Sequence, residues 1–450
     1  MTSWPLEEIA QRVVRDALAA GADAAECTAA EGSQFSVNVR KGEIETLTEA
    51  GSCGIGLRVL RGQYVGSAYT SDLTDDGLRT MVSSASELSR ITTADPFAGL
   101  PAAEDLGKLD GDLGLYDGSV AELPAQWKID QARAAEAAAL EADPRISNSE
   151  GASFDSTISR RVFANSLGFT GSYRSSFCAL SAVPVATDNG AMQRDYWRSL
   201  ARNASGLESP EAVGKKAAER TLRRLGARKV PTQKVPVLFE PRVARSLLDH
   251  IFDAVNGSSI YRGESFLAGS MGQRIAPEHF TLVDDATIPG RFGTSPFDDE
   301  GVTSRRTTVI EAGVLRSWLL NSYSARKLNL RTTGNASRGI TGNAGVGHGN
   351  LYLEPGTASP DDLIGGIQSG LYVTELIGFG VNTVTGDYSR GAVGLWIENG
   401  RLTYPVHEIT IAGTLQEMLL GIEAIGSDLE FRGSIASPTL LIREMTVSGT

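Results

Sequence analysis

Four histidines are the natural starting point, because imidazole is a common zinc ligand and general base. They are His250, His279, His348 and His407, and no two of them lie within five positions of each other. A zinc-binding helix of the HExxH kind needs two histidines one helical turn apart on the same face. The spacing excludes that motif, and His250, beside an apolar helix face, is by itself typical of a hydrogen-bonded structural histidine.

The densest polar cluster is the segment TGDYSRG at residues 385–391. It places Asp387, Tyr388 and Arg390 between two glycines, and these side chains can position hydrogen bonds to the backbone or carboxylate of a bound ligand. The alternative is a tight turn held by an ion pair between Asp387 and Arg390. The residues alone leave both interpretations open.

A second cluster, SSIYRGESF at residues 258–266, directly follows the segment that contains His250. It combines Tyr261 and Arg262 with several hydroxyl groups. This mixture of aromatic, cationic and hydroxyl side chains is a candidate wall of a binding cleft, and a solvated loop is the alternative.

Two further motifs are weaker. The segment GNASRGITGNAGVGHG at residues 334–349 lacks the Gly-Lys-Ser/Thr ending of a phosphate-binding loop, so a flexible surface or cleft-lining loop is predicted, with ordering over a ligand as the alternative. Ser324 and Lys327 match the S-x-x-K pattern of acylating serine enzymes, but no K-T-G follows. Serine hydrolysis is therefore not predicted.

The composition narrows the class of partner. The chain has 450 residues and a net charge of −12, which repels nucleic acid and anionic membranes over most of the surface. No segment approaches the length of apolar sequence that spans a bilayer, and the N-terminal region has charged residues where a signal peptide needs an apolar run. We expect a cytoplasmic protein that has no direct contact with nucleic acid or membrane.

The elements of the first half alternate between helix and strand patterns. The predicted elements, in chain order, are a helix at 6–18, a hairpin turning at Lys41 and Gly42, strands near 55–60 and 64–69, a helix at 75–90 capped by Asp72, a helix at 125–142, strands between 146 and 200, and a helix at 210–225. Helix followed by strands occurs twice, which suggests an internal duplication.

The second half begins with a predicted strand at 235–239 and a helix at 243–255. Short strands and glycine-rich turns follow, with one clear helix predicted at 359–370. We expect the α+β class, with an N-terminal domain of helices and antiparallel strands at 1–228. The C-terminal domain at 229–450 is predicted to be a curved, mostly antiparallel, barrel-like sheet with few helices. The boundary is placed in a basic, proline-containing connector.

Several longer segments carry a family resemblance. They are GADAAE at 21–26, GTSPFDDEGV at 293–302, SWLLNSYSARKL at 317–328, VTELIGFGVNTVTGDYSRGAVGLWIENG at 373–400 and YPVHEITIAG at 404–413. These segments resemble the TldD/PmbA family, also described as modulators of DNA gyrase, and specifically its PmbA branch, also called TldE. The resemblance covers essentially the whole chain.

The resemblance implies a cytosolic bacterial or archaeal protein that acts in proteolysis of peptides or unfolded segments within a complex of paired chains. The TldD branch carries zinc on a helix with an HExxxH pattern. Transferred residue by residue, the first histidine falls on His250, the glutamate on Ile251 and the second histidine on Val255. The resemblance thus implies no metal and no catalytic residue in this chain, with zinc expected in a TldD-type partner.

Two functions compete at this stage. The first is a non-zinc-binding subunit of a metallopeptidase complex, paired with a TldD-type chain, with itself, or with both. Its candidate substrate-binding residues are His250, Tyr261, Arg262, Asp387, Tyr388 and Arg390. The second is a catalytically inactive homo-oligomeric peptide-binding protein. A third hypothesis, a hydrolase that uses Asp387 and His407, would require activity of the isolated chain that survives chelators.

Overall fold

Alternating residues on either side of Lys41 and Gly42 form a long antiparallel hairpin of β1 (Ala24–Arg40) and β2 (Glu43–Arg61) in the computed structural model, which describes residues 5–449. The two turn residues have φ values of 54° and 78°, the left-handed backbone of a type I′ turn. The predicted hairpin is confirmed. The separate strand predicted at 55–60 is wrong, because these residues continue β2 without a break.

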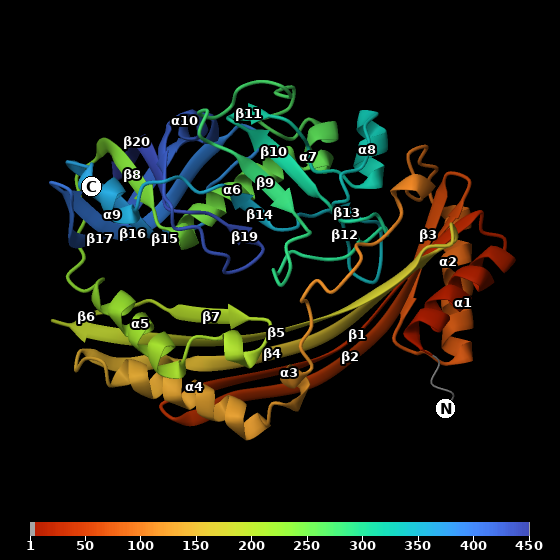
Figure 1. Cartoon of the computed structure of the whole chain (residues 1–450), viewed down its shortest axis with the longest axis horizontal. Coiled ribbons are helices and arrows are strands. Elements are labelled where there is room, and N and C mark those ends of the chain that lie inside the picture. The colour runs from red at the N-terminus through yellow and green to blue at the C-terminus, as the bar shows by residue number, and fades with distance from the viewer. Residues whose placement is uncertain (1–4, 450) are drawn as a thin grey trace.

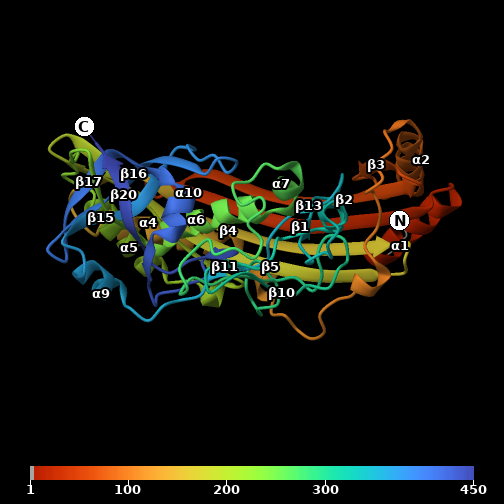
Figure 2. The same ribbon diagram turned by 90° about the horizontal axis from the view of Figure 1, so that it is seen from above.

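The hairpin is part of one curved sheet with strand order β3-β2-β1-β4-β5-β6 and with β7 paired to β5. The added strands are β3 (Tyr64–Thr70), β4 (Ile146–Asn165), β5 (Thr170–Asp188), β6 (Ala191–Arg194) and β7 (Trp197–Ala201). Figures 1 and 2 show the long strands running along the molecule and arching beneath the second half of the chain.

The order of this sheet is symmetric about the β1–β4 pair. A helix, a set of antiparallel strands and a second helix lie on each side of the pair; the helices are α1 (Leu6–Ala19), α2 (Asp75–Ile91), α4 (Ala125–Leu140) and α5 (Pro210–Leu222). An internal duplication would produce this arrangement. The duplication and the domain boundary at 228/229 stay predictions.

All four helices cover the same face of the sheet. Odd-numbered residues of β1 such as Cys27 pack under α1 and α2, and Val37 packs under α4 and α5. Even-numbered residues, including Glu26, face the second half.

The predicted cap of α2 is wrong: Thr74 is the N-cap, and the Asp72 carboxylate instead accepts a hydrogen bond from the Thr74 backbone N–H. A short helix, α3 (Ser119–Glu122), and two 3-10 turns, η1 (Ala103–Asp105) and η2 (Ala204–Gly206), complete this half.

The second half contains a closed barrel. Its strands pair in the order β17-β16-β15-β8-β20, and β17 also pairs with β20, which closes the ring. They are β8 (Gln233–Phe239), β15 (Ser369–Ile377), β16 (Asp387–Glu398), β17 (Arg401–Thr414) and β20 (Leu440–Ser448), with β18 (Ile422–Ile425) beside β20. The β15–β8 pair is parallel and the other pairs are antiparallel. The predicted α+β class and the barrel-like, mostly antiparallel sheet are confirmed.

A smaller sheet and short helices surround the barrel. The sheet has the order β11-β10-β9-β14-β19. The elements are β9 (Leu282–Asp285), β10 (Arg306–Glu311), β11 (Val314–Leu315), β12 (Ala336–Ser337), β13 (Gly345–Val346), β14 (Leu351–Leu353) and β19 (Ile435–Ala436), and the helices are α6 (Pro241–Val255), α7 (Gly257–Arg262), α8 (Ser322–Leu328), α9 (Pro360–Gly365) and α10 (Leu415–Leu420). The predicted helix at 359–370 is therefore too long, and α7, α8 and α10 were missed because such short helices show no periodicity.

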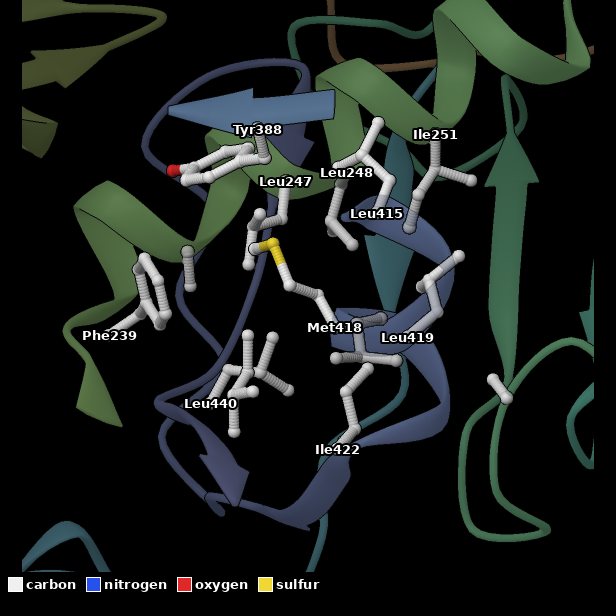
Figure 3. Close-up of a cluster of buried hydrophobic side chains, with 14 of the residues drawn as sticks. Phe239, Leu247, Leu248, Ile251, Tyr388, Leu415, Met418, Leu419, Ile422 and Leu440 are labelled. Atoms are coloured by element: carbon white, nitrogen blue, oxygen red, sulfur yellow. The ribbon is translucent and has the colours of Figure 1, made fainter. Parts of the chain in front are cut away.

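Helix α6 is anchored in the hydrophobic core of this half. Leu248 and Ile251 on α6 pack with Met418 on α10 and Leu440 on β20 (Figure 3). All four side chains are almost fully buried. This packing fixes which face of α6 is available to a ligand. No helix within residues 5–449 is long and apolar enough to cross a membrane.

Candidate functional site

The structure brings His250 and Tyr388 together from distant parts of the sequence. His250 is half-buried near the end of α6, and Tyr388 on β16 is 2% exposed. The two ring centroids lie 6.2 Å apart with the ring planes at 73°, an edge-to-face contact. Two of the predicted site residues, His250 on α6 and Tyr388 on β16, thus form one group in the structure.

Both side chains have polar atoms that find no partner within the described part of the chain: His250 Nε2 and Tyr388 Oη. A buried polar atom without a hydrogen bond is costly, and such atoms occur where a ligand or water completes the arrangement. Burial lowers the pKa of His250, Asp249 acts in the opposite direction, and the charge of Arg390 lowers it further. His250 is therefore neutral at pH 7 and can accept or donate one hydrogen bond at Nε2.

Arg390 belongs to the same group, and Asp387 lies at its margin. The Arg390 Nε donates a hydrogen bond of 3.4 Å to the backbone oxygen of Ile377. The Asp387 Oδ2 accepts a hydrogen bond of 2.6 Å from the Thr385 hydroxyl. Among residues 5–449 no carboxylate, including Asp387, lies within ion-pair distance of Arg390. Asp387 and Arg390 are the first and fourth residues of strand β16, so the alternative of a tight turn held by their ion pair is wrong.

Tyr261 and Arg262 belong to a different group. The Tyr261 ring lies 5.9 Å from that of Tyr323 on α8, and the Lys327 ammonium lies 4.1 Å from the ring centroid of Phe97 in the first half. Lys327 also lies over the Tyr261 and Tyr323 rings. Arg262 pairs with Glu264 at 3.7 Å, and a hydrogen bond to Tyr261 raises the pKa of Arg262. The predicted site residues therefore divide into two groups, and no contact described for residues 5–449 links Tyr261 or Arg262 directly to His250.

An exposed apolar loop connects β15 to β16 beside the His250 group. Phe379 is 99% exposed, and the side chains of Ile377 and Val384 are about half exposed. The Phe266 backbone N–H donates a hydrogen bond of 2.9 Å to the Thr383 oxygen, which ties this loop to the segment after α7. Sequence reasoning missed this surface. Its signal was the apolar run IGFGV immediately before the polar cluster.

Two weaker motifs have structural roles. The buried Ser324 hydroxyl hydrogen-bonds to Asn321 in the capping box of α8, which explains the S-x-x-K match without catalysis. The glycine-rich segment 334–349 lies against the first half, where a Cβ placed on Gly56 of β2 would collide with the backbone oxygen of Ile340. The segment also stays at the surface, since Gly339, Thr341 and Asn343 are exposed, which agrees with the prediction of a surface or cleft-lining loop. Its flexibility and its ordering over a ligand stay predictions.

The positions matched to the zinc motif point into the core. Ile251 is 2% exposed and Val255 is fully buried, both in the main cluster of the second half. A zinc ligand at Val255 would have to leave this packing to meet His250. Within residues 5–449, no three His, Cys, Asp or Glu side chains gather in a way that could hold a metal ion.

Comparison with known sequences defines the class of protein. Models of three metallopeptidase domains match consecutive parts of the chain. They are "PmbA/TldA metallopeptidase domain 1" at residues 25–89, the "central domain" at 118–225 and the "C-terminal domain" at 232–449. Together they cover most of the curved sheet, the barrel and α6. The chain belongs to the PmbA/TldD family.

Individual relatives support this membership over the full length. The Metalloprotease PmbA of Escherichia coli O157:H7 is 40% identical over 433 residues, covering 96% of this chain and 94% of that protein. The Metalloprotease PmbA homolog of Haemophilus influenzae is 38% identical over 448 residues, covering 98% and 96%. A crystal structure from Bacteroides thetaiotaomicron, provisionally described as a modulator of DNA gyrase, is 29% identical with a TM-score of 0.92 over 100% of both chains. The family prediction is confirmed.

Proposed function

We propose that this chain is the zinc-free subunit of a cytoplasmic metallopeptidase complex and that it binds peptide beside a TldD-type, zinc-carrying partner. The observation that carries the proposal is the orientation of α6. Ile251 and Val255 are buried in the core, whereas His250 keeps an unpartnered Nε2 next to Tyr388 and Arg390. The helix therefore retains the one zinc-motif position that suits ligand binding and uses the other two for packing.

The His250 group suits recognition of a peptide rather than its hydrolysis. His250 Nε2 and Tyr388 Oη are both buried in this structure, so a peptide reaches them only when the surrounding side chains move aside; each atom can then hydrogen-bond to a peptide backbone group. The Arg390 guanidinium, which has no carboxylate partner among the described residues, can hold a backbone carbonyl or a carboxylate with its planar fork. Hydrolysis by the family chemistry also requires a zinc-activated water, which the partner would supply.

The exposed loop supports association with another chain. Phe379, Ile377 and Val384 place apolar area in water, and burying it against a partner would be favourable by about 25 cal/mol per Å². The loop adjoins Arg390 through the hydrogen bond to the Ile377 oxygen. A partner on this loop would therefore lie next to the proposed peptide site.

The test is a peptidase assay of the isolated chain, of a TldD-type chain and of the two together, with zinc measured in each sample. We expect activity and zinc in the mixture and neither in the isolated chain. Peptidase activity of the isolated chain that survives chelators, or about one tightly held zinc per chain, would overturn the proposal. Homo-oligomers that bind peptide and do not associate with a TldD-type chain would favour the inactive peptide-binding protein instead.

A second experiment tests the peptide site. Arg390→Ala should raise the KM of the complex while assembly, zinc content and melting temperature stay unchanged, because Arg390 has no ion pair within residues 5–449 to lose. Arg443→Ala is the matched control, since Arg443 is an exposed arginine on β20. A loss of stability with unchanged activity per folded complex would remove Arg390 from the site.

A further inference from the structure

A cavity of about 320 Å³ lies between the two halves of the chain, away from the His250 group. Its walls come from β7 and α5 of the first half and from the start of α6, β15 and residues 430–437 of the second half. Its volume is at the lower end of the range for small-molecule sites.

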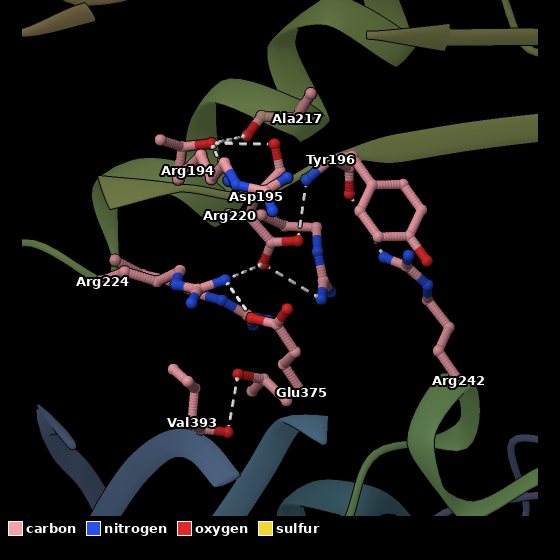
Figure 4. Close-up of polar contacts among 12 residues, drawn as sticks. Arg194, Asp195, Tyr196, Ala217, Arg220, Arg224, Arg242, Glu375 and Val393 are labelled. Atoms are coloured by element: carbon pink, nitrogen blue, oxygen red, sulfur yellow. Dashed lines mark hydrogen bonds and ion pairs between the residues drawn. The ribbon is translucent and has the colours of Figure 1, made fainter. Parts of the chain in front are cut away.

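The cavity is strongly cationic in a protein whose net charge is −12. Seven cationic side chains and two carboxylates, Glu240 and Glu430, line it. Part of the positive charge is neutralised. Arg220 pairs with Glu240 at 2.8 Å and with Asp195 at 3.3 Å, and Arg432 pairs with Glu430 at 2.8 Å. Figure 4 shows Arg220 and Asp195 within this network.

Three of the lining arginines have no such partner. Within residues 5–449 no carboxylate lies within 4.0 Å of the guanidinium groups of Arg198, Arg242 or Arg245. The guanidinium of Arg242 lies over the ring of Tyr196, 4.3 Å from its centroid, and its Nη1 donates a hydrogen bond of 3.3 Å to the Tyr196 backbone oxygen (Figure 4). Burial and then the charge of Arg220 lower the pKa of Arg242, and Tyr196 and Glu240 act in the opposite direction without cancelling the shift.

Two further observations point to a missing anion. Arg220 is 4% exposed and lines the cavity, yet its Nε has no hydrogen-bond partner in the described structure. Helix α6 also begins at this cavity, at Pro241, and no side chain within residues 5–449 caps it. A helix N-terminus carries partial positive charge and attracts anions.

We propose that this cavity binds a small ligand with at least two negative charges, presented as phosphate or carboxylate oxyanions. Arginine forks match both groups bidentately, and only a multiply charged anion offsets the three unpaired arginines. Because the walls come from both halves, the bound ligand holds them together. This site is separate from the proposed peptide site and does not depend on it.

The experiment uses the full chain and three probes: inorganic phosphate, inorganic pyrophosphate and citrate. Isothermal titration calorimetry and melting curves are recorded for the wild type and for Arg198→Gln, Arg242→Gln and Arg245→Gln. We expect at least one probe to bind and to raise the melting temperature, and each variant to bind it about 10-fold more weakly. The probe that binds identifies phosphate or carboxylate as the preferred source of the oxyanion.

Arg316→Gln is the matched control, because Arg316 is an exposed arginine outside the cavity that pairs with Glu311. Arg198 and Arg245 are exposed, so their variants keep the test valid if Arg242→Gln does not fold. Failure of all three probes to bind at about 10 mM, or equal binding by the wild type and the cavity variants, would overturn the proposal.

Discussion

The two halves of the chain meet at two charged contacts that differ in their charge balance. At the carboxylate-rich contact, Arg338 and Arg58 pair with Glu26 at 2.6 and 2.8 Å, and Arg161 pairs with Asp299 at 2.8 Å. At the arginine-rich cavity, three arginines have no carboxylate partner within the described residues. At the first contact each of these arginines has a carboxylate partner, although Arg338 Nε and Nη2 find no hydrogen bond among residues 5–449. The second contact leaves three arginines without a carboxylate and an open volume.

The difference separates a contact that holds the fold together from one that is prepared for a ligand. The Arg338 and Glu26 side chains are 4% and 2% exposed, so each depends on the other in place of water. Asp298 and Glu300 lie nearby with raised pKa values, caused first by burial and then by a neighbouring carboxylate. The raised pKa values allow these carboxylates to take up a proton at a higher pH than exposed ones, which would reduce the negative charge here. In the cavity, arginine keeps its proton at neutral pH, so the positive charge cannot be reduced by titration and would be balanced by the proposed anion.

The largest predicted effect is the loss of the buried pair. Arg338→Ala leaves Glu26 buried with only Arg58 as a partner, and we expect a loss of about 3–5 kcal/mol in the free energy of unfolding. Chemical denaturation of the variant and of Arg316→Ala measures it, with the exposed Arg316 as control. If both variants lose a similar free energy of unfolding, the carboxylate-rich contact does not hold the fold together, and the proposed difference from the arginine-rich cavity is wrong.

The packing of the glycine-rich segment on β2 is the next test. In Gly56→Ala the new Cβ meets the Ile340 backbone oxygen, so the contact between the halves must shift, and we expect a loss of about 1–3 kcal/mol. Gly339→Ala in the same segment is the control, because its Cβ would have no neighbour within 4 Å among the described atoms. Equal melting temperatures for both variants would contradict this close packing.

The protonation of the carboxylate-rich contact can be tested by pH. The pKa of Glu300 is raised above 4.5, mainly by burial and then by the charge of Glu26. At a pH between the unfolded-state pKa of Glu300 and its higher folded-state pKa, the folded state binds more protons than the unfolded state. The contribution of Glu300 to the free energy of unfolding therefore falls as the pH rises through this range. Glu300→Gln lacks the effect and can still accept the hydrogen bond from the Ser322 N–H. We expect the free energy of unfolding of Glu300→Gln to rise relative to that of the wild type between pH 4.5 and pH 7, as measured by denaturation at each pH. A difference between the two proteins that does not change with pH would contradict this.

The smallest predicted effect is in the cavity. Arg245→Gln removes an exposed arginine that has no carboxylate partner within residues 5–449, so we expect a change within about 0.5 kcal/mol in the absence of an anion. Thermal melting in a buffer free of phosphate and citrate measures it. A large loss would mean that the arginine supports the fold, and the contrast between the two contacts would disappear.

Much of the local structure follows directly from the sequence. The Lys41–Gly42 turn, the α6 helix and the strand patterns depend on neighbouring residues, so periodicity and turn chemistry predicted them, and the family segments identified the relatives. The extent of β1 and β2 did not follow, because their central residues have no uniform pattern of burial. The lengths of these strands depend on backbone hydrogen bonds to neighbouring strands, which the local sequence does not predict.

The grouping of the candidate residues was decided only by the tertiary structure. Tyr388 joins His250 because β16 and α6 pack in one core, whereas Tyr261 and Arg262 turn toward α8. The cationic cavity likewise assembles arginines from β7, α5 and α6, which are far apart in the sequence. Sequence determines which groups are present and which local elements carry them. Burial and charge balance depend on the distances between elements, and only packing sets those distances.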